Sequence, residues 1–92
     1  MIFNGKELLP IFEIVFEILS PSTRQRDLRI KVVKYEEMGV KEYWIIDPKV
    51  KTVTVHDFVN DTAETYGIHD TIKSLAHPEI SIAVEMLFEE FE

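Results

Sequence analysis

Hydrophobic and polar positions alternate near the start of the chain, over residues 9–19. Successive side chains of an extended segment point to opposite faces, and here both faces are largely apolar. One face would carry Phe12, Ile14, Phe16 and Ile18, and the other Glu13, Val15, Glu17 and Leu19. A strand that is apolar on both faces is typical of the interior of a mixed sheet with both sides covered.

A helix is predicted over residues 23–38, where apolar positions recur at spacings of three and four. The apolar stripe consists of Leu28, Val32, Tyr35 and Met38. Gly39 follows directly, and glycine suits the left-handed conformation in which many helices end. Val40 is then expected to pack back on Tyr35.

Residues 42–47 (EYWIID) predict a second strand, nearly all apolar after its first residue. A strand, a helix and a strand joined by short links indicate a parallel crossover. Residues 51–58 alternate again and predict a hairpin partner for the second strand, after a turn that begins at Asp47-Pro48. Weaker signals predict strands at 63–68 and 80–83 and a short acidic helix or turn at 84–91. The predicted fold is α/β, a mixed sheet with a strand–helix–strand crossover followed by a β-hairpin.

The composition is that of one folded domain spanning residues 1–92, since 46% of the residues are apolar. Cysteine is absent, which excludes a disulfide framework and a cysteine zinc site. The start of the sequence lacks the features of a signal peptide, and no stretch reaches the roughly 20 apolar residues that span a bilayer. We therefore expect a soluble cytoplasmic protein that does not contact membranes.

The charge is uneven along the chain. The net charge is -7, which disfavours unaided nucleic-acid binding, because phosphate contacts need lysine and arginine. Residues 22–35, however, carry five basic residues against one acid. The basic residues are Arg24, Arg26, Arg29, Lys31 and Lys34. Two interpretations stay open, a surface that faces DNA phosphates or a solvated helix face.

Short motifs follow one another in a specific order between residues 12 and 48. They are Glu17, Leu19-Ser20-Pro21-Ser22-Thr23, Asp27, Lys31 with Tyr35, Gly39-Val40, Glu42-Tyr43-Trp44 and Asp47-Pro48. In this order they resemble the signature of the Uma-type family of putative restriction endonucleases, in the PD-(D/E)XK nuclease superfamily. Residues 70–88 are similar to the ending of that family. The resemblance covers most of this chain but only the C-terminal part of the family.

The resemblance implies a restriction-endonuclease-like core and Mg²⁺-dependent cleavage of DNA. It assigns metal binding to Glu17 and a catalytic role to Lys31. Many superfamily members carry their lysine two positions after the glutamate, where this chain has Leu19, and the Uma-type pattern supplies it from the helix instead. Two simpler interpretations stay open: Lys31 is an ordinary exposed helix lysine, and Glu17 is a strand-end acid or the partner of an arginine.

Glu13 is a second metal-ligand candidate, although the family usually has Asp after Pro where this chain has Phe12-Glu13. Four residues along a straight strand separate Cα atoms by roughly 13 Å. Carboxylate bonds to Mg²⁺ are only about 2 Å, so one strand cannot bring Glu13 and Glu17 onto the same ion. In the family the second carboxylate comes from an upstream strand, and we expect the domain to be N-terminally truncated and to lack that strand.

Two functional hypotheses remain. The first is an Mg²⁺-dependent DNA endonuclease that uses Glu17 and Lys31. The second is a non-catalytic remnant that acts as an oligomerisation or interaction module. Without an upstream strand the first strand would have an exposed edge, so we predict a homodimer. The three histidines, His56, His69 and His77, lack the spacing of metal ligands, so we expect them to be surface or strand residues. We expect Tyr35, Tyr43 and Trp44 to pack in the core rather than to stack on bases.

Overall fold

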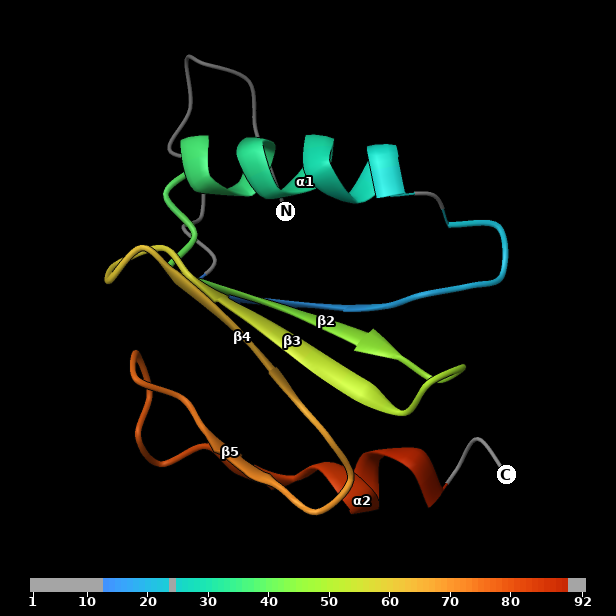
Figure 1. Cartoon of the computed structure of the whole chain (residues 1–92). Coiled ribbons are helices and arrows are strands. Elements are labelled where there is room, and N and C mark those ends of the chain that lie inside the picture. Colours follow the sequence, from blue (N-terminus) through green and yellow to red (C-terminus); the bar gives the residue numbers. More distant parts are fainter. Residues whose placement is uncertain (1–12, 24, 90–92) are drawn as a thin grey trace.

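The computed structural model describes residues 13–23 and 25–89 (Figure 1). Its elements in chain order are β1 (Ile14–Ile18), α1 (Gln25–Glu37), β2 (Glu42–Asp47), β3 (Thr52–Asp57), β4 (Thr62–Tyr66), β5 (Thr71–Lys73), β6 (Ser81–Ala83) and α2 (Val84–Phe88). Neither helix of this described part is long and apolar enough to cross a membrane.

The main sheet has four strands in the order β1-β2-β3-β4. β1 and β2 pair in parallel across the α1 crossover, and β2, β3 and β4 follow as antiparallel neighbours. The predicted α/β class, the crossover and the hairpin are all confirmed. The hairpin turn after Asp47 also forms as predicted, with the Asp47 side chain accepting a 3.0 Å hydrogen bond from the amide of Lys49.

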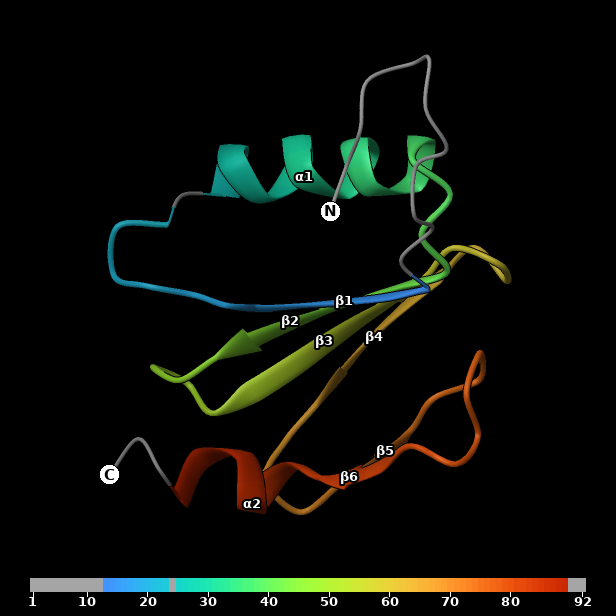
Figure 2. The same cartoon turned by 180° about the vertical axis from the view of Figure 1, so that it is seen from behind.

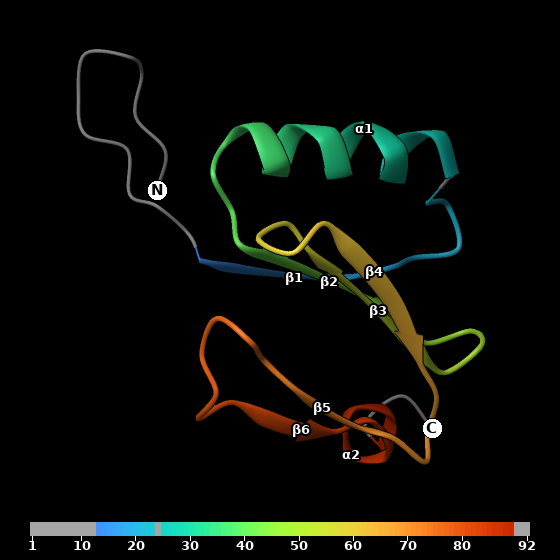
Figure 3. The same cartoon turned by 60° about the vertical axis from the view of Figure 1, so that its left-hand side comes forward.

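Three layers make up the molecule (Figures 2 and 3). α1 covers one face of the main sheet, and the β5–β6 ribbon with α2 covers the other. Alternation along β2 sends Tyr43 and Ile45 towards α1, while Trp44 and Ile46 face the C-terminal layer. Because β2 lies inside the sheet and is covered on both faces, its first five residues are buried.

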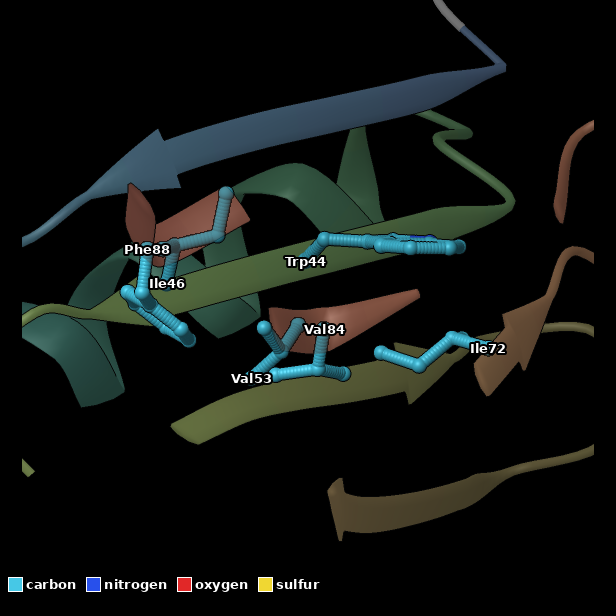
Figure 4. Packing of buried hydrophobic residues seen from close by; sticks show 6 residues of the cluster. All are labelled: Trp44, Ile46, Val53, Ile72, Val84 and Phe88. Atoms are coloured by element: carbon cyan, nitrogen blue, oxygen red, sulfur yellow. The ribbon is translucent and has the colours of Figure 1, made fainter. Parts of the chain in front are cut away.

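The largest core lies between the main sheet and the C-terminal layer (Figure 4). Its buried members are Trp44, Ile46, Val53, Ile72, Val84 and Phe88. The C-terminal residues therefore complete the core of the sheet. The face beneath α1 is less tightly closed, since no residue of α1 itself is buried.

The end of α1 follows the sequence prediction. Gly39 adopts φ 86°, and its amide donates to the carbonyl of Glu36 at 3.1 Å. The amide of Val40 donates to the carbonyl of Tyr35, also at 3.1 Å. These two bonds form a Schellman motif, which satisfies carbonyls that a helix end would otherwise leave unpaired.

The strand predicted over residues 9–19 corresponds to β1, which runs from Ile14 to Ile18. Residues 9–12 lie outside the described part, so the start of this strand and its interior position in the sheet stay predictions. Among the described strands β1 pairs with β2 alone. The short strand β5 was missed, because Thr71–Lys73 offers one apolar residue between two polar ones and so no clear pattern.

Candidate functional site

Glu17, Lys31 and Tyr43 meet on the side of the sheet that α1 covers. Lys31 Nζ donates to Glu17 Oε2 at 2.5 Å, and the hydroxyl of Tyr43 donates to Glu17 Oε1. Each oxygen of the carboxylate thus has one donor. The resemblance selected Glu17 and Lys31 as functional residues, and the fold brings these two side chains together.

The sheet and the crossover place these three groups. In the parallel register Val15 lies opposite Tyr43 and Glu17 lies opposite Ile45, so Glu17 and Tyr43 share the face beneath α1. α1 then returns over this face, and the side chain of Lys31 reaches β1. Because α1 covers it, the side chain of Glu17 is mostly buried, with 18% exposed, whereas 41% of the Lys31 side chain is exposed.

The three groups hold one another in defined protonation states. Partial burial opposes ionisation of Glu17, but the hydrogen bonds from Lys31 and Tyr43 outweigh it and keep its pKa below the usual value. The hydrogen bond to Glu17 raises the pKa of Lys31. Burial, followed by the hydrogen bond to Glu17, raises the pKa of Tyr43. At neutral pH the site therefore consists of a carboxylate, an ammonium and a neutral phenol.

The carboxylate of Glu17 is chemically suited to Mg²⁺, which prefers oxygen ligands. A carboxylate has about four acceptor positions, and Lys31 and Tyr43 use two of them. Among residues 13–23 and 25–89, however, no group of three or more His, Cys, Asp or Glu could hold a metal ion. Glu17 thus fits as one arm of a metal site, and the described residues do not complete that site.

Glu13 does not lie with Glu17. It occupies a bend before β1, where its carboxylate contacts His77 Nε2 and lies 3.6 Å from Lys41 Nζ. The hydrogen bond with His77 is the main cause of the low pKa of Glu13. The bend breaks the alternation that put Glu13 and Glu17 on one face in the sequence analysis.

The predicted DNA contacts lie mainly on the outer side of α1. Arg26, Arg29 and Lys34 are exposed, and Arg24 lies outside the described residues. Lys34 shares with Lys31 an open hollow of about 470 Å³, which the hydroxyl residues Ser22 and Thr23 also line. Arg29 lines a separate cleft between α1 and the sheet.

That cleft has a volume of about 520 Å³ and a polar floor. Thr54 and His56 of β3 and Asp47 at the end of β2 form the floor, because alternate residues of β3 face α1. Leu28 and Val32 of α1 form the apolar wall. Burial lowers the pKa of His56, so its imidazole is neutral at neutral pH.

Two important polar groups were missed in the sequence analysis. Tyr43 was predicted as a core aromatic, and it is fully buried, but its contact with Glu17 was not foreseen. Glu42 was taken as the polar start of a strand and is only 2% exposed. Its carboxylate accepts hydrogen bonds from Trp44 Nε1, Ser74 Oγ and the amides of Leu75 and Ala76. The sequence signal that could have indicated the burial of Glu42 is its place directly before the apolar run at residues 43–46.

Comparison with known proteins settles the family. The model of the Uma2 family, described as "Putative restriction endonuclease", matches residues 4–85. This chain belongs to the Uma2 family. The resemblance inferred from the motifs is thereby confirmed. Glu17 and Lys31, which contact each other, both lie within the residues of this Uma2 protein that the family model matches.

A solved structure shares the Uma2 chain's fold. It is a putative nuclease belonging to DUF820 from Anabaena variabilis, with a TM-score of 0.72 and 23% sequence identity. The match covers 87% of this chain and 46% of the Anabaena chain. This chain therefore spans less than half of the length of that structure. No curated protein matches the chain.

Proposed function

We propose that this chain carries the glutamate and the lysine of an Mg²⁺-dependent DNA endonuclease. The observation that supports it is the contact between Glu17 and Lys31, the two residues for which the motif resemblance implies a role in the chemistry. Membership of a family described as putative restriction endonucleases supports DNA as the substrate class of this proposal, and the fold shared with the Anabaena structure is consistent with it.

Each residue has a separate task in this proposal. The Glu17 carboxylate holds the metal through the acceptor positions that Lys31 and Tyr43 leave free. Lys31 keeps its proton and acts as a positive hydrogen-bond donor to a phosphate oxygen or to water, not as a base. Tyr43 fixes the orientation of Glu17 from beneath. When bound, Mg²⁺ lowers the pKa of its water and stabilises charge on phosphate.

The hollow beside Lys31 offers a place for the DNA backbone. Its lining includes Lys31, Lys34 and the hydroxyl residues Ser22 and Thr23, which can donate to phosphate oxygens, together with Asp27 and Ile30. Arg26 and Arg29 extend the positive charge along the exposed side of α1. These residues offset the overall acidity of the chain locally.

A plasmid-nicking assay with Mg²⁺ or Mn²⁺ tests the proposal. We expect cleavage by the wild type and a loss of at least about 100-fold with Glu17→Gln or Lys31→Met, the scale of a lost electrostatic contribution. Glu85→Gln and Lys73→Met are matched controls, because both residues are exposed on the C-terminal layer. Lys34→Met should weaken DNA binding and make it less sensitive to salt.

Metal binding gives a second measurement that does not depend on turnover. Calorimetric titration with Mn²⁺ should show binding that Glu17→Gln abolishes and Glu85→Gln leaves unchanged. Cleavage that survives Glu17→Gln and Lys31→Met would contradict the assignment. A wild type that neither cleaves DNA nor binds Mn²⁺ would favour the non-catalytic interaction module.

A further inference from the structure

The helix α1 lies over the main sheet without burying any of its own residues. Two of its apolar residues, Leu28 and Val32, line the cleft of about 520 Å³ between helix and sheet. An open volume of this size means that these two side chains do not close the space beneath the helix. The height of α1 above the sheet therefore depends on contacts elsewhere along the helix.

Tyr35 makes such a contact. Its ring packs against the ring of Tyr43 on β2, with the centroids 4.9 Å apart and an angle of 58° between the ring planes. This separation lies in the range in which aromatic rings attract each other. Because Tyr43 is fully buried, it offers a fixed surface on which the half-buried Tyr35 rests.

This ring contact lies one helical turn from Lys31. Residues four positions apart are neighbours on one face of a helix, so Tyr35 and Lys31 approach the sheet together. The hydroxyl of Tyr43 and the ammonium of Lys31 each donate to one carboxylate oxygen of Glu17. The four side chains form a closed circuit of contacts, from Tyr35 through Tyr43 and Glu17 to Lys31 and back along α1.

The backbone holds Tyr35 in place as well. Its carbonyl accepts a 3.1 Å hydrogen bond from the amide of Val40, which is only 4% exposed. β2 begins two residues later, at Glu42. Tyr35 is thus fixed at its backbone by the entry into β2 and at its ring by Tyr43, whereas 41% of the Lys31 side chain is exposed.

We propose that Tyr35 is a positioning residue of the Glu17–Lys31 site. Its ring, resting on Tyr43, sets the height of α1 above the sheet and thereby the reach of the Lys31 ammonium to the Glu17 carboxylate. The consequence for DNA cleavage rests on the proposed function and passes through Lys31. The consequence for the Glu17–Lys31 pair does not depend on that function.

A role in packing alone predicts something different. An apolar side chain between helix and sheet stabilises the fold by removing apolar area from water. Loss of such a side chain lowers the free energy of unfolding, but it leaves Glu17 and Lys31 unchanged in the molecules that stay folded. Loss of a positioning residue changes the pair within the folded protein.

NMR titration of the Glu17 carboxyl in the folded protein measures this difference. Partial burial opposes ionisation of Glu17, but the hydrogen bonds from Lys31 and Tyr43 keep its pKa below 4.5. Tyr35→Leu removes the ring but keeps an apolar side chain of high helix propensity, and it should raise this pKa towards 4.5. Tyr35→Phe keeps the ring and should keep the wild-type pKa. Leu28→Ala is the matched control, which should lower stability and leave the pKa of Glu17 unchanged.

A double variant tests whether Tyr35 acts through Lys31. In the Lys31→Met background, Tyr35→Leu should produce no further shift in the pKa of Glu17, because residues that act through one another are not additive. If Tyr35→Leu does not fold, Tyr35→Met takes its place with the same expectation.

The rate of plasmid nicking gives a readout at the level of catalysis. A displacement of about 1 Å can cost about 100-fold in rate, so Tyr35→Leu should lower kcat by about 10-fold to 100-fold. The KM for DNA should stay near the wild-type value, since the basic side chains of α1 remain. Tyr35→Phe should restore the rate.

Three results would overturn the proposal: an unchanged pKa of Glu17 in Tyr35→Leu, an equal shift in Leu28→Ala, or a further shift when Tyr35→Leu is added to Lys31→Met. A wild type that does not cleave DNA contradicts only the endonuclease, because the titration still decides the role of Tyr35.

Discussion

The hydroxyl of Tyr43 on β2 donates a hydrogen bond to the carboxylate of Glu17 on β1. The two residues are 26 positions apart in the chain, and the parallel register of two adjacent strands brings them together. Tyr43 is fully buried, whereas Lys31 is partly exposed. The sheet therefore provides the rigid support for Glu17, and α1 supplies the charge.

Replacement of Tyr43 by phenylalanine tests this support. Tyr43→Phe keeps the ring but leaves Glu17 without one donor, so we expect a loss of about 1–2 kcal/mol in the free energy of unfolding. The pKa of Glu17 should rise towards its ordinary value. Urea unfolding and the pH dependence of the midpoint measure both effects. Tyr66→Phe, which removes an exposed contact with Glu64, should change stability by less than about 0.5 kcal/mol.

The Lys31 ion pair should contribute less to stability than the Tyr43 hydrogen bond. With 41% of its side chain exposed, Lys31 is screened by solvent. Lys31→Met should therefore lower stability by less than about 1 kcal/mol. A larger loss in Lys31→Met than in Tyr43→Phe would show that the pair is mainly structural.

The buried carboxylate of Glu42 fastens the C-terminal layer to the sheet. Its four donors include the amides of Leu75 and Ala76, which belong to the loop between β5 and β6. Glu42→Gln keeps the shape but turns an amide group towards two of these donors. Since each unsatisfied buried donor costs about 1–3 kcal/mol, we expect a loss of roughly 3 kcal/mol.

Urea unfolding followed by the fluorescence of Trp44 measures this effect, since Trp44 donates to the same carboxylate. Glu37→Gln is the matched control, because Glu37 is exposed at the end of α1. A loss below about 1 kcal/mol in Glu42→Gln, similar to that in the control, would contradict the anchoring role.

The sequence predicted those parts of the molecule that depend on local pattern. The crossover, the end of α1 at Gly39 and the buried strand β2 all follow from periodicity and glycine placement. The pairing of Glu17 with Lys31 followed from the family motifs rather than from any period. The contacts of Glu42 were missed because they join residues 32 to 34 positions apart, which no short pattern records.

The position of Glu13 shows a second reason why a structural prediction from the sequence can fail. Alternation assumes a straight strand, and a bend at Glu13 turns its side chain to His77, 64 positions further along the chain. One non-extended residue is enough to change the face on which a side chain lies. Predictions of face therefore fail first at the ends of strands.

Gly39 carries a backbone conformation that other residues adopt at a cost. At φ 86° a Cβ atom meets nothing within 4 Å, so the cost of Gly39→Ala is one of backbone strain and not of packing. We expect a loss of about 1 kcal/mol in the free energy of unfolding, from the left-handed conformation. Gly67→Ala is the control, with a Cβ at an ordinary 3.9 Å from Asp70. Equal losses in both variants would contradict this explanation.

The contact between His77 and Glu13 should make stability depend on pH. Both ring nitrogens of His77 face carboxylate oxygens, Nε2 that of Glu13 and Nδ1 that of Glu79 at 3.1 Å. The hydrogen bond with Glu13 is the first cause of the raised pKa of His77 and of its counterpart, the lowered pKa of Glu13. The folded protein therefore favours the imidazolium and the carboxylate together.

The pH dependence of stability follows from the raised pKa of His77 and the lowered pKa of Glu13. The contribution of His77 is complete below its ordinary pKa of 6.5 and is lost as the pH rises through the higher folded value. The contribution of Glu13 is complete above its ordinary pKa of 4.5 and is lost as the pH falls through the lower folded value. The pair should stabilise the fold most between pH 4.5 and 6.5.

The measurement is the difference in urea midpoint between wild type and His77→Gln across this range. We expect the wild type to be more stable near pH 5.5 and the difference to disappear as the pH rises through the raised pKa of His77 and the ring becomes neutral. The exposed His69 gives the matched variant His69→Gln, which should keep the pH dependence of the wild type. If His77→Gln instead parallels the wild type at every pH, the contact does not hold the β5–β6 loop to the start of β1.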